Sequence, residues 1–171
     1  MSTSATATTD SSSNQFTVTN NNNVLFNYQS PFNNAPCGSI LFNGTNQYLS
    51  NFTNNAALAM GSGDFTIEFW FNGASQLNKF FYDNRGGTSA TYPHITTGTT
   101  TSTLRWGPTN TTGSIIIGNN QWNHCAVTRQ SGTVKLWVNG VLSYTASYST
   151  SITNPSTTSA CIGMYGTNTY N

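Results

Sequence analysis

The segment from Gln121 to Leu142 constrains the fold of this chain more than any other. Apolar and polar residues alternate on both sides of Gln130-Ser131-Gly132 and again up to Asn139-Gly140. Glycine supplies the positive φ that tight hairpins require, and Asn-Gly between alternating apolar residues is a strong short-range hairpin signal. We therefore predict three consecutive antiparallel strands, with chain reversals at these two places.

A second alternating segment runs from Asp64 to Asn72. Its period of two places apolar side chains on one face, and Thr66, Glu68 and Trp70 on the other. We expect the apolar face to pack in the core against one side of the three-strand segment. The residues of this predicted core are Phe65, Ile67, Phe69 and Phe71 together with Val134, Leu136 and Val138.

Further short segments of strand character recur about every ten residues, with almost no helical periodicity. This pattern is typical of an all-β fold with two antiparallel sheets packed as a β-sandwich. One short helical turn is expected at 54–60. The additional strands are predicted at 15–19, 24–28, 39–43, 47–50, 79–82, 102–106, 114–117 and 160–165.

Charged residues make up only 5% of the 171 residues, and the net charge is +1. Such a chain has no field that would attract nucleic acid or an anionic membrane surface, so we expect neither partner. No stretch approaches the roughly 18 consecutive apolar residues of a membrane span. The first ten residues lack the basic and apolar regions of a secretory signal, and we expect none.

Three regions are predicted along the chain. Residues 1–14 form a low-complexity arm that we expect to run over neighbouring subunits of a packed assembly, 15–37 hold N-terminal strands and a loop, and 38–171 form the sandwich.

The three cysteines, Cys37, Cys125 and Cys161, fit no metal spacing and cannot all pair within the chain. We interpret them as small buried apolar side chains.

Five sequence blocks occur in a set order over residues 38–163. They are residues 38–49, 63–70, 122–129, 134–140 and Ile162-Gly163. In this order they resemble the laminin-G-like domains of the concanavalin A-like lectin/glucanase superfamily. The resemblance implies a two-sheet jelly roll used for binding glycans or proteins. The Ser/Thr/Asn-rich composition is similar to that of copies found in phage and other viral structural proteins.

The chain departs from this family after the last block, because it stops six residues after Tyr165, where relatives continue with another strand or two. Three explanations stay open. The chain is a fragment, or the strands of residues 15–28 supply the missing edge, or a neighbouring subunit does. Since an open sheet edge is a template for pairing, strand exchange between subunits is one hypothesis.

Calcium and catalysis are both disfavoured by the four carboxylates of the chain. Many relatives hold Ca²⁺, which takes six to eight oxygen ligands; Asp83 is the one weak candidate here, and no other metal or cofactor is expected. A retaining glycosidase needs two carboxyl groups about 5–5.5 Å apart. Asp64 and Glu68 share a strand face but would be about 13 Å apart. We interpret His124 as a structural, hydrogen-bonded residue.

A glycan site needs an exposed aromatic ring beside amide groups, because sugars present apolar C–H faces together with hydroxyls. The candidate ligand-binding residues are Tyr82, Asn84, Arg85, Tyr92, Trp106 and Asn110. The alternative is that Tyr82 and Trp106 only cover the edge of the sandwich. Trp122 and Trp137 are interpreted as packing residues.

The function predicted from these features is that of a non-enzymatic structural protein on a virion surface: a decoration, fibre or tail component. It would assemble with copies of itself or with other virion proteins as a homo-oligomer or a larger assembly, and it would also contact glycans. The alternative is a glycan-binding or adhesion module of an extracellular protein.

Overall fold

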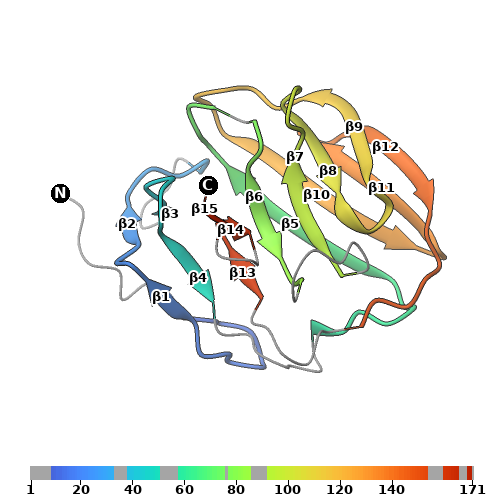
Figure 1. Ribbon diagram of the computed structural model, residues 1–171, viewed down its shortest axis with the longest axis horizontal. Coiled ribbons are helices and arrows are strands. Elements are labelled where there is room, and N and C mark those ends of the chain that lie inside the picture. Colours follow the sequence, from blue (N-terminus) through green and yellow to red (C-terminus); the bar gives the residue numbers. More distant parts are fainter. Residues whose placement is uncertain are drawn as a thin grey trace.

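The computed structural model describes residues 9–32, 38–50, 58–75, 77–85, 92–153, 160–165 and 169–170. Strands dominate these ranges. Their helical residues are Leu58 and the 3-10 turn η2 (Gly107–Thr109), and no helix in these ranges is long and apolar enough to cross a membrane. The strands are β1 (Thr19–Asn21), β2 (Leu25–Asn27), β3 (Ser39–Leu41), β4 (Tyr48–Ser50), β5 (Phe65–Phe71), β6 (Phe80–Asp83), β7 (His94–Thr97), β8 (Thr103–Trp106), β9 (Thr111–Ile116), β10 (Asn123–Gln130), β11 (Thr133–Val138), β12 (Val141–Ser147), β13 (Cys161–Ile162), β14 (Met164–Tyr165) and β15 (Thr169–Tyr170) (Figure 1).

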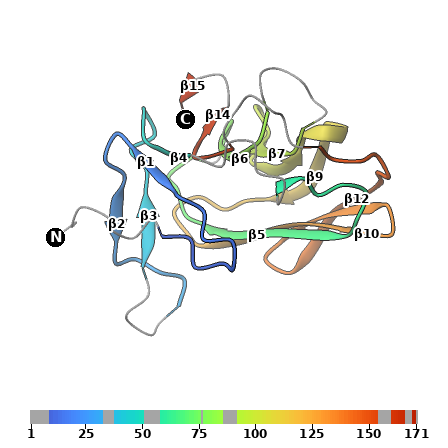
Figure 2. The same ribbon diagram turned by 90° about the horizontal axis from the view of Figure 1, so that it is seen from below.

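Two antiparallel sheets form the two layers of a β-sandwich, as predicted. The larger sheet has seven strands in the order β1-β4-β13-β6-β7-β8-β9, and the smaller has four in the order β12-β11-β10-β5. Figure 2 shows β5, β10 and β12 in one layer and β6, β7 and β9 in the other. The pairs β2-β3 and β14-β15 form separate two-stranded sheets.

The predicted three-strand segment is confirmed as β10, β11 and β12. Both hairpin turns carry two successive residues with positive φ: Ser131 (47°) and Gly132 (74°) in the first, Asn139 (51°) and Gly140 (77°) in the second. This geometry matches the right-handed twist of the flanking strands. Strand β5 completes the sheet by pairing with β10.

The predicted core is also confirmed. Val134, Leu136 and Val138 are at most 1% exposed, and the apolar side of β5 packs against them. The seven-stranded sheet contributes the other half of this core, including Ile95, Leu104 and Trp106, each fully buried.

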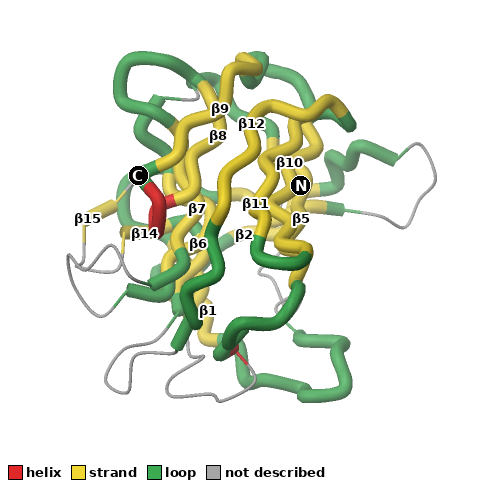
Figure 3. The backbone as a smooth tube through the Cα atoms, turned by 90° about the vertical axis from the view of Figure 1, so that its right-hand side faces the viewer, coloured by secondary structure: helices red, strands yellow, loops and turns green. Residues whose placement is uncertain are grey.

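The two long edges of the sandwich differ in how they are closed. At one edge, β1 pairs with β4, with Thr19 opposite Ser50, so a strand from residues 15–28 of the same chain occupies the edge. This is one of the three arrangements that the sequence left open. At the other side β9 and β12 run side by side (Figure 3), and Ser143 Oγ accepts a hydrogen bond from the Ile115 backbone N–H at 3.0 Å.

Some predicted elements differ from the structure. Strand β7 was not predicted, because Ile95 is its single apolar residue. The strand expected at 15–19 is reduced to a bridge between Thr9 and Thr17, and β1 begins only at Thr19. The arm over residues 1–8, the helical turn except its last residues, and Cys37 lie outside the described residues.

The interpretation of the cysteines is confirmed for Cys125 and Cys161, which are buried. Burial raises the pKa of the Cys125 thiol to about 12. Burial and the nearby Asp83 carboxylate raise the pKa of Cys161 to about 11. Both side chains therefore stay protonated and act as packing groups.

Candidate functional site

Strand β7 separates the sandwich core from the outer surface of the seven-stranded sheet. Ile95 lies in the core, so its neighbours His94 and Thr96 point to the opposite side. Pairing places Asp83 opposite His94, and Arg105 opposite Thr96. These side chains therefore share the outer surface of the sheet. We call this surface the polar face and define it by Asp83, Arg85, His94, Arg105 and Asn110.

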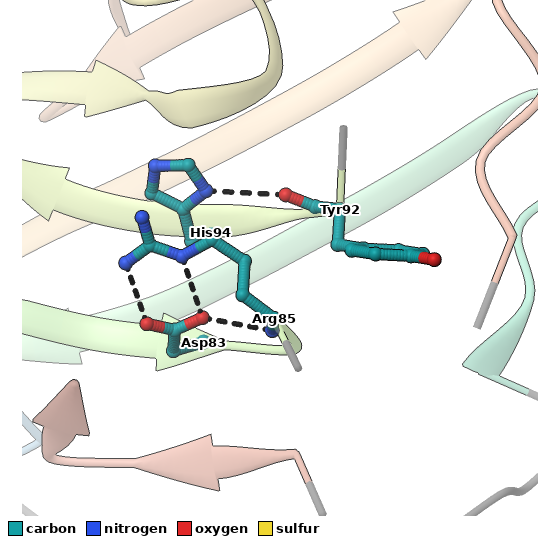
Figure 4. A network of polar contacts seen from close by, with 4 residues as sticks. All are labelled: Asp83, Arg85, Tyr92 and His94. Atoms are coloured by element: carbon teal, nitrogen blue, oxygen red, sulfur yellow. Dashed lines mark hydrogen bonds and ion pairs between the residues drawn. The ribbon is translucent and has the colours of Figure 1, made fainter. Parts of the chain in front are cut away.

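A buried ion pair forms the centre of the polar face (Figure 4). The Arg85 guanidinium donates to both Asp83 carboxylate oxygens, from Nε to Oδ1 at 2.9 Å and from Nη2 to Oδ2 at 2.6 Å. Asp83 Oδ1 also accepts the Arg85 backbone N–H at 2.9 Å. The guanidinium lies over the Phe80 ring, with Cζ 5.6 Å from the centroid. Such two-point pairs hold both groups in a defined orientation.

This pair bears on the calcium candidate, Asp83. Its carboxylate is fully buried and both oxygens accept hydrogen bonds from a cation, which would repel Ca²⁺. Within the described ranges, no three His, Cys, Asp or Glu side chains come together as a metal site. The structure thus gives Asp83 a cationic partner of its own.

His94 lies beside this pair and is held as a neutral imidazole. Burial, and next the charge of Arg85, lower its pKa to about 4, with a smaller lowering contribution from Arg105. Its Nδ1 lies 3.1 Å from the Tyr92 carbonyl oxygen, to which Nδ1–H donates. The ring packs directly against Gly107 of η2, where any side chain would overlap it. His94 is therefore fixed in position and does not carry charge near neutral pH.

Arg105 is the second cation of the polar face. Its Nη2 donates to the Asn110 side-chain oxygen. Asn110 ends η2 with a left-handed backbone, φ 55°, and its own N–H donates to the Gly107 carbonyl. The Nε–H of Arg105 is buried and has no hydrogen-bond partner among the described residues. Buried donors of this kind are rare in folded proteins.

The concentration of charge here is unusual for this chain. The whole sequence has nine charged residues, five basic and four acidic, and two histidines. Three of the nine, Asp83, Arg85 and Arg105, lie together with one of the two histidines on the polar face. Since buried and mutually perturbed ionisable groups gather at functional sites, the polar face is the candidate site.

Of the six ligand-binding candidates predicted from the sequence, three lie at the polar face and three do not. Arg85 and Asn110 belong to the polar face, and Tyr92 adjoins it through its carbonyl group, although Figure 4 shows its ring directed away from Arg85. Asn84 is buried, and its N–H donates to the Pro93 carbonyl at 2.9 Å, which closes the connection between β6 and β7.

Trp106 was wrongly predicted as a ligand-binding ring. It pairs with Ile95, points into the core and is fully buried against the Phe65 ring at 5.7 Å. Tyr82 also packs against the core, and burial raises the pKa of its phenol. Both rings are packing residues of the sandwich, because the alternation of their strands turns them inward.

His94 and Arg105 were missed. The signal that would have found Arg105 is a charged residue between apolar neighbours, Leu104 and Trp106, in a chain with very few charges. His94 carried no such signal, because β7 was not recognised as a strand.

The outer surface of the four-stranded sheet is a second polar region, and unlike the polar face it carries aromatic rings that reach the solvent. We call it the aromatic face and define it by Trp70, His124, Thr128, Lys135 and Trp137. Trp137 Nε1 donates to Thr128 Oγ1 at 3.1 Å, and Lys135 Nζ lies 5.9 Å from the Trp137 ring centroid. A shallow groove of about 490 Å³ is lined by Thr128, Lys135 and Trp137 of this face, together with residues at the start of β5 and the end of β10.

His124 is held on the aromatic face as a structural residue, as interpreted from the sequence. Its Nε2 lies 3.3 Å from Glu68 Oε2, and its ring lies 5.2 Å from that of Trp70. The pairing of β5 with β10 brings Glu68 to it, although the two are far apart in sequence.

Among the solved structures that share this fold, three are compared with this chain. The binding domain of Paraclostridial mosquitocidal protein 1 is 16% identical, with a TM-score of 0.68 over 99% of this chain and 45% of that one. Domain 4 of AbnA, an extracellular arabinanase of Geobacillus stearothermophilus solved with arabinotriose, is 18% identical, with a TM-score of 0.59 over 91% of this chain and 77% of that one. A putative carbohydrate-binding protein of Bacteroides ovatus is 19% identical, with a TM-score of 0.52 over 74% and 44%.

At these identities the likeness establishes the fold alone. This chain spans less than half the length of the mosquitocidal and Bacteroides chains. No curated protein is similar enough in sequence to count as a relative. The model of a laminin-G-type family, described as the concanavalin A-like lectin/glucanases superfamily, matches residues 43–170. The chain therefore belongs to the concanavalin A-like lectin/glucanases superfamily, in its laminin-G-type family.

Proposed function

We propose that this chain is a non-catalytic glycan-binding module whose ligand site is the polar face. The observation that carries the proposal is the gathering of three of the nine charged residues, with a neutral histidine, on one sheet surface. Charged groups are costly to bury unless they are paired or used. Their position on the outer surface of the sheet, rather than in the core, favours use by a ligand.

The polar face offers sugar hydroxyls both donors and acceptors. Arg105 Nε–H is a donor without a partner among the described residues, and the Asn110 amide nitrogen is a second donor next to it. On the same face, the two-point ion pair holds the Asp83 and Arg85 side chains in fixed positions. Since few rotatable groups would need ordering on binding, such a surface loses little entropy when it takes a ligand.

A binding role is favoured over glycoside hydrolysis by the same residues. Hydrolysis uses two carboxyl groups on opposite sides of the sugar, and Asp83 is the one carboxylate of the polar face. Both of its oxygens are already bonded to the Arg85 guanidinium, so neither is placed to reach a glycosidic oxygen. The lowered pKa of His94, about 4, leaves it a weak base.

The solved relatives give this proposal its first probes. One was solved with arabinotriose and another is named a putative carbohydrate-binding protein. Arabino-oligosaccharides therefore stand first in a glycan array, beside other plant and bacterial oligosaccharides.

The experiment is a glycan array on the full chain and three variants. We expect Asn110→Ala and Arg105→Gln to lower binding of the best glycan by about tenfold or more, because each removes a hydrogen bond to it. The matched control is Trp137→Ala on the aromatic face, which is expected to bind normally. Loss of binding in the control alone would move the site to the aromatic face.

We also propose a place for the module, the surface of a virion, which the viral style of its sequence supports. The alternative is that the module is a glycan-binding or adhesion part of an extracellular protein. Washed, purified particles that contain the chain in stoichiometric amount would support the first, and particles without it would leave the second. Its assembly with copies of itself stays a prediction, to be tested by light scattering.

A further inference from the structure

We propose that the ligand of the polar face carries a carboxylate, so that the module prefers acidic sugars such as uronic acids. This inference rests on the proposed function and names its ligand class. Its basis is that the charge of Arg105 is left without a compensating carboxylate.

The first step is the balance of charge on the polar face. The Asp83 carboxylate binds Arg85 at two points, so this pair is neutral. His94, whose pKa is lowered to about 4, is neutral near pH 7. Arg105 is then the remaining charge, and its hydrogen-bond partner is the neutral Asn110 side chain. The face therefore carries a net positive charge of one.

The second step is that the other three side-chain carboxylates, all in described residues, have partners other than Arg105. Asp10 accepts hydrogen bonds from Ser12 and Phe16 in the N-terminal segment. Asp64 accepts the Ser131 N–H, and Glu68 lies beside His124. With Asp83 paired to Arg85, these account for all four side-chain carboxylates.

The third step is a comparison with Arg129, which also lacks a carboxylate. Arg129 is 1% exposed, but its Nε, Nη1 and Nη2 atoms all donate to backbone carbonyl oxygens, including those of Gly63 and Thr150. Its donors are therefore used within the fold. Arg105 differs because its buried Nε–H has no partner among the described residues.

The fourth step is the chemistry of the missing partner. The guanidinium edge formed by Nε and Nη2 binds a planar carboxylate by two parallel hydrogen bonds, which a neutral hydroxyl does not match. Because Nε is buried, this binding requires the atoms that cover it to move aside. The Asn110 amide nitrogen beside it can donate to a neighbouring sugar hydroxyl. The chemistry thus points to an acidic rather than a neutral sugar, and we assign the acid to a carboxylate, with the sulfate as the competing outcome of the test.

The test compares sugars that differ in the carboxylate alone. The full chain is titrated, by calorimetry or NMR, with oligogalacturonides and their methyl esters, with glucuronic-acid-substituted and unsubstituted xylo-oligosaccharides, with glucose 6-sulfate against glucose, and with arabinotriose. We expect the free acid of at least one pair to bind about ten- to hundredfold more tightly than its neutral partner, as for a hydrogen bond to a charged group.

Variants tie this preference to Arg105. Arg105→Gln should abolish the preference for the acid, and Arg105→Lys should restore it only in part. Lys135→Gln, which removes a cation from the aromatic face, should leave it unchanged. Because Arg105 is half-buried, circular dichroism and thermal unfolding of each variant confirm that it is folded.

The remaining outcomes separate this inference from the proposed function. Binding of neutral sugars on the polar face, with no acid preference and no effect of Arg105→Gln on selectivity, would overturn the inference and leave the proposed function standing. A preference for the sulfate would overturn the carboxylate assignment. If no sugar binds, or if only Lys135→Gln changes binding, the inference and the proposed function both fail.

Discussion

The two outer surfaces of the sandwich use polar residues in opposite ways. On the polar face the ion pair is buried: Asp83 is fully buried and the Arg85 side chain is 8% exposed. On the aromatic face the comparable pair is open, since the side chains of His124 and Glu68 are 26% and 63% exposed. The difference teaches that exposed aromatic rings do not by themselves identify a functional site. Exposed apolar side chains are common on protein surfaces, whereas burying a charged group costs free energy that must be offset.

The tryptophans give the largest expected contrast between the two sheets. Trp106→Ala should lower the free energy of unfolding by about 3–5 kcal/mol, because it empties a fully buried site beside Phe65. Trp137→Ala should lower it by about 1–2 kcal/mol, because the ring is only half-buried and its loss also breaks the hydrogen bond to Thr128. Urea denaturation measures both. Equal losses would contradict the inward orientation of Trp106.

The two ion pairs give the next contrast. Asp83→Asn should lower the free energy of unfolding by about 3 kcal/mol, since it leaves the Arg85 guanidinium buried without its counter-charge. Glu68→Gln should change it by less than about 1 kcal/mol, as for exposed pairs. Chemical denaturation at low and high salt checks the result, because only the exposed pair should respond to salt.

His94, on the polar face, should make the stability of the folded chain depend on pH. The pKa of His94 is lowered from 6.5 to about 4 in the folded chain, so the unfolded chain binds more protons between these values. Stability should therefore fall as the pH drops from about 6.5 towards 4, by about 2 kcal/mol between pH 7 and pH 5.

Denaturation curves at both pH values, for the natural chain and for His94→Gln, measure this effect. The variant should lose the His94 contribution to the slope, whereas His124→Gln should keep it. A slope that survives in His94→Gln would assign the effect to another group.

The smallest expected effect concerns Tyr82. Its phenol oxygen is buried and has no hydrogen-bond partner among the described residues, so Tyr82→Phe should stabilise the chain by up to about 1 kcal/mol. The comparison is Thr128→Val, which removes the acceptor of the Trp137 N–H and should cost about 0.5–1 kcal/mol. Thermal unfolding of the two variants shows whether each is more or less stable than the natural chain. A destabilised Tyr82→Phe would reveal a bound partner at this oxygen.

The fold was predictable where alternation and turns agree. The Asn139-Gly140 turn and the alternating residues of β5, β10 and β11 act locally, so a single sequence contains their signal. The site was not, because it depends on register: Asp83, His94 and Arg105 meet only through the pairing of β6, β7 and β8. Trp106 shows the same limit, since one residue of register decides whether a ring faces the core or the outside.

The carbonyl contacts of Arg129 have a consequence for the folding rates. This side chain joins β10 to Gly61 and Gly63, residues 68 and 66 positions away in sequence, and to Thr150 at 21 positions. Contacts across such separations require large loops to close and tend to form late. We therefore expect Arg129→Met to accelerate unfolding while leaving the folding rate nearly unchanged, so that this arginine sets how long the native chain persists.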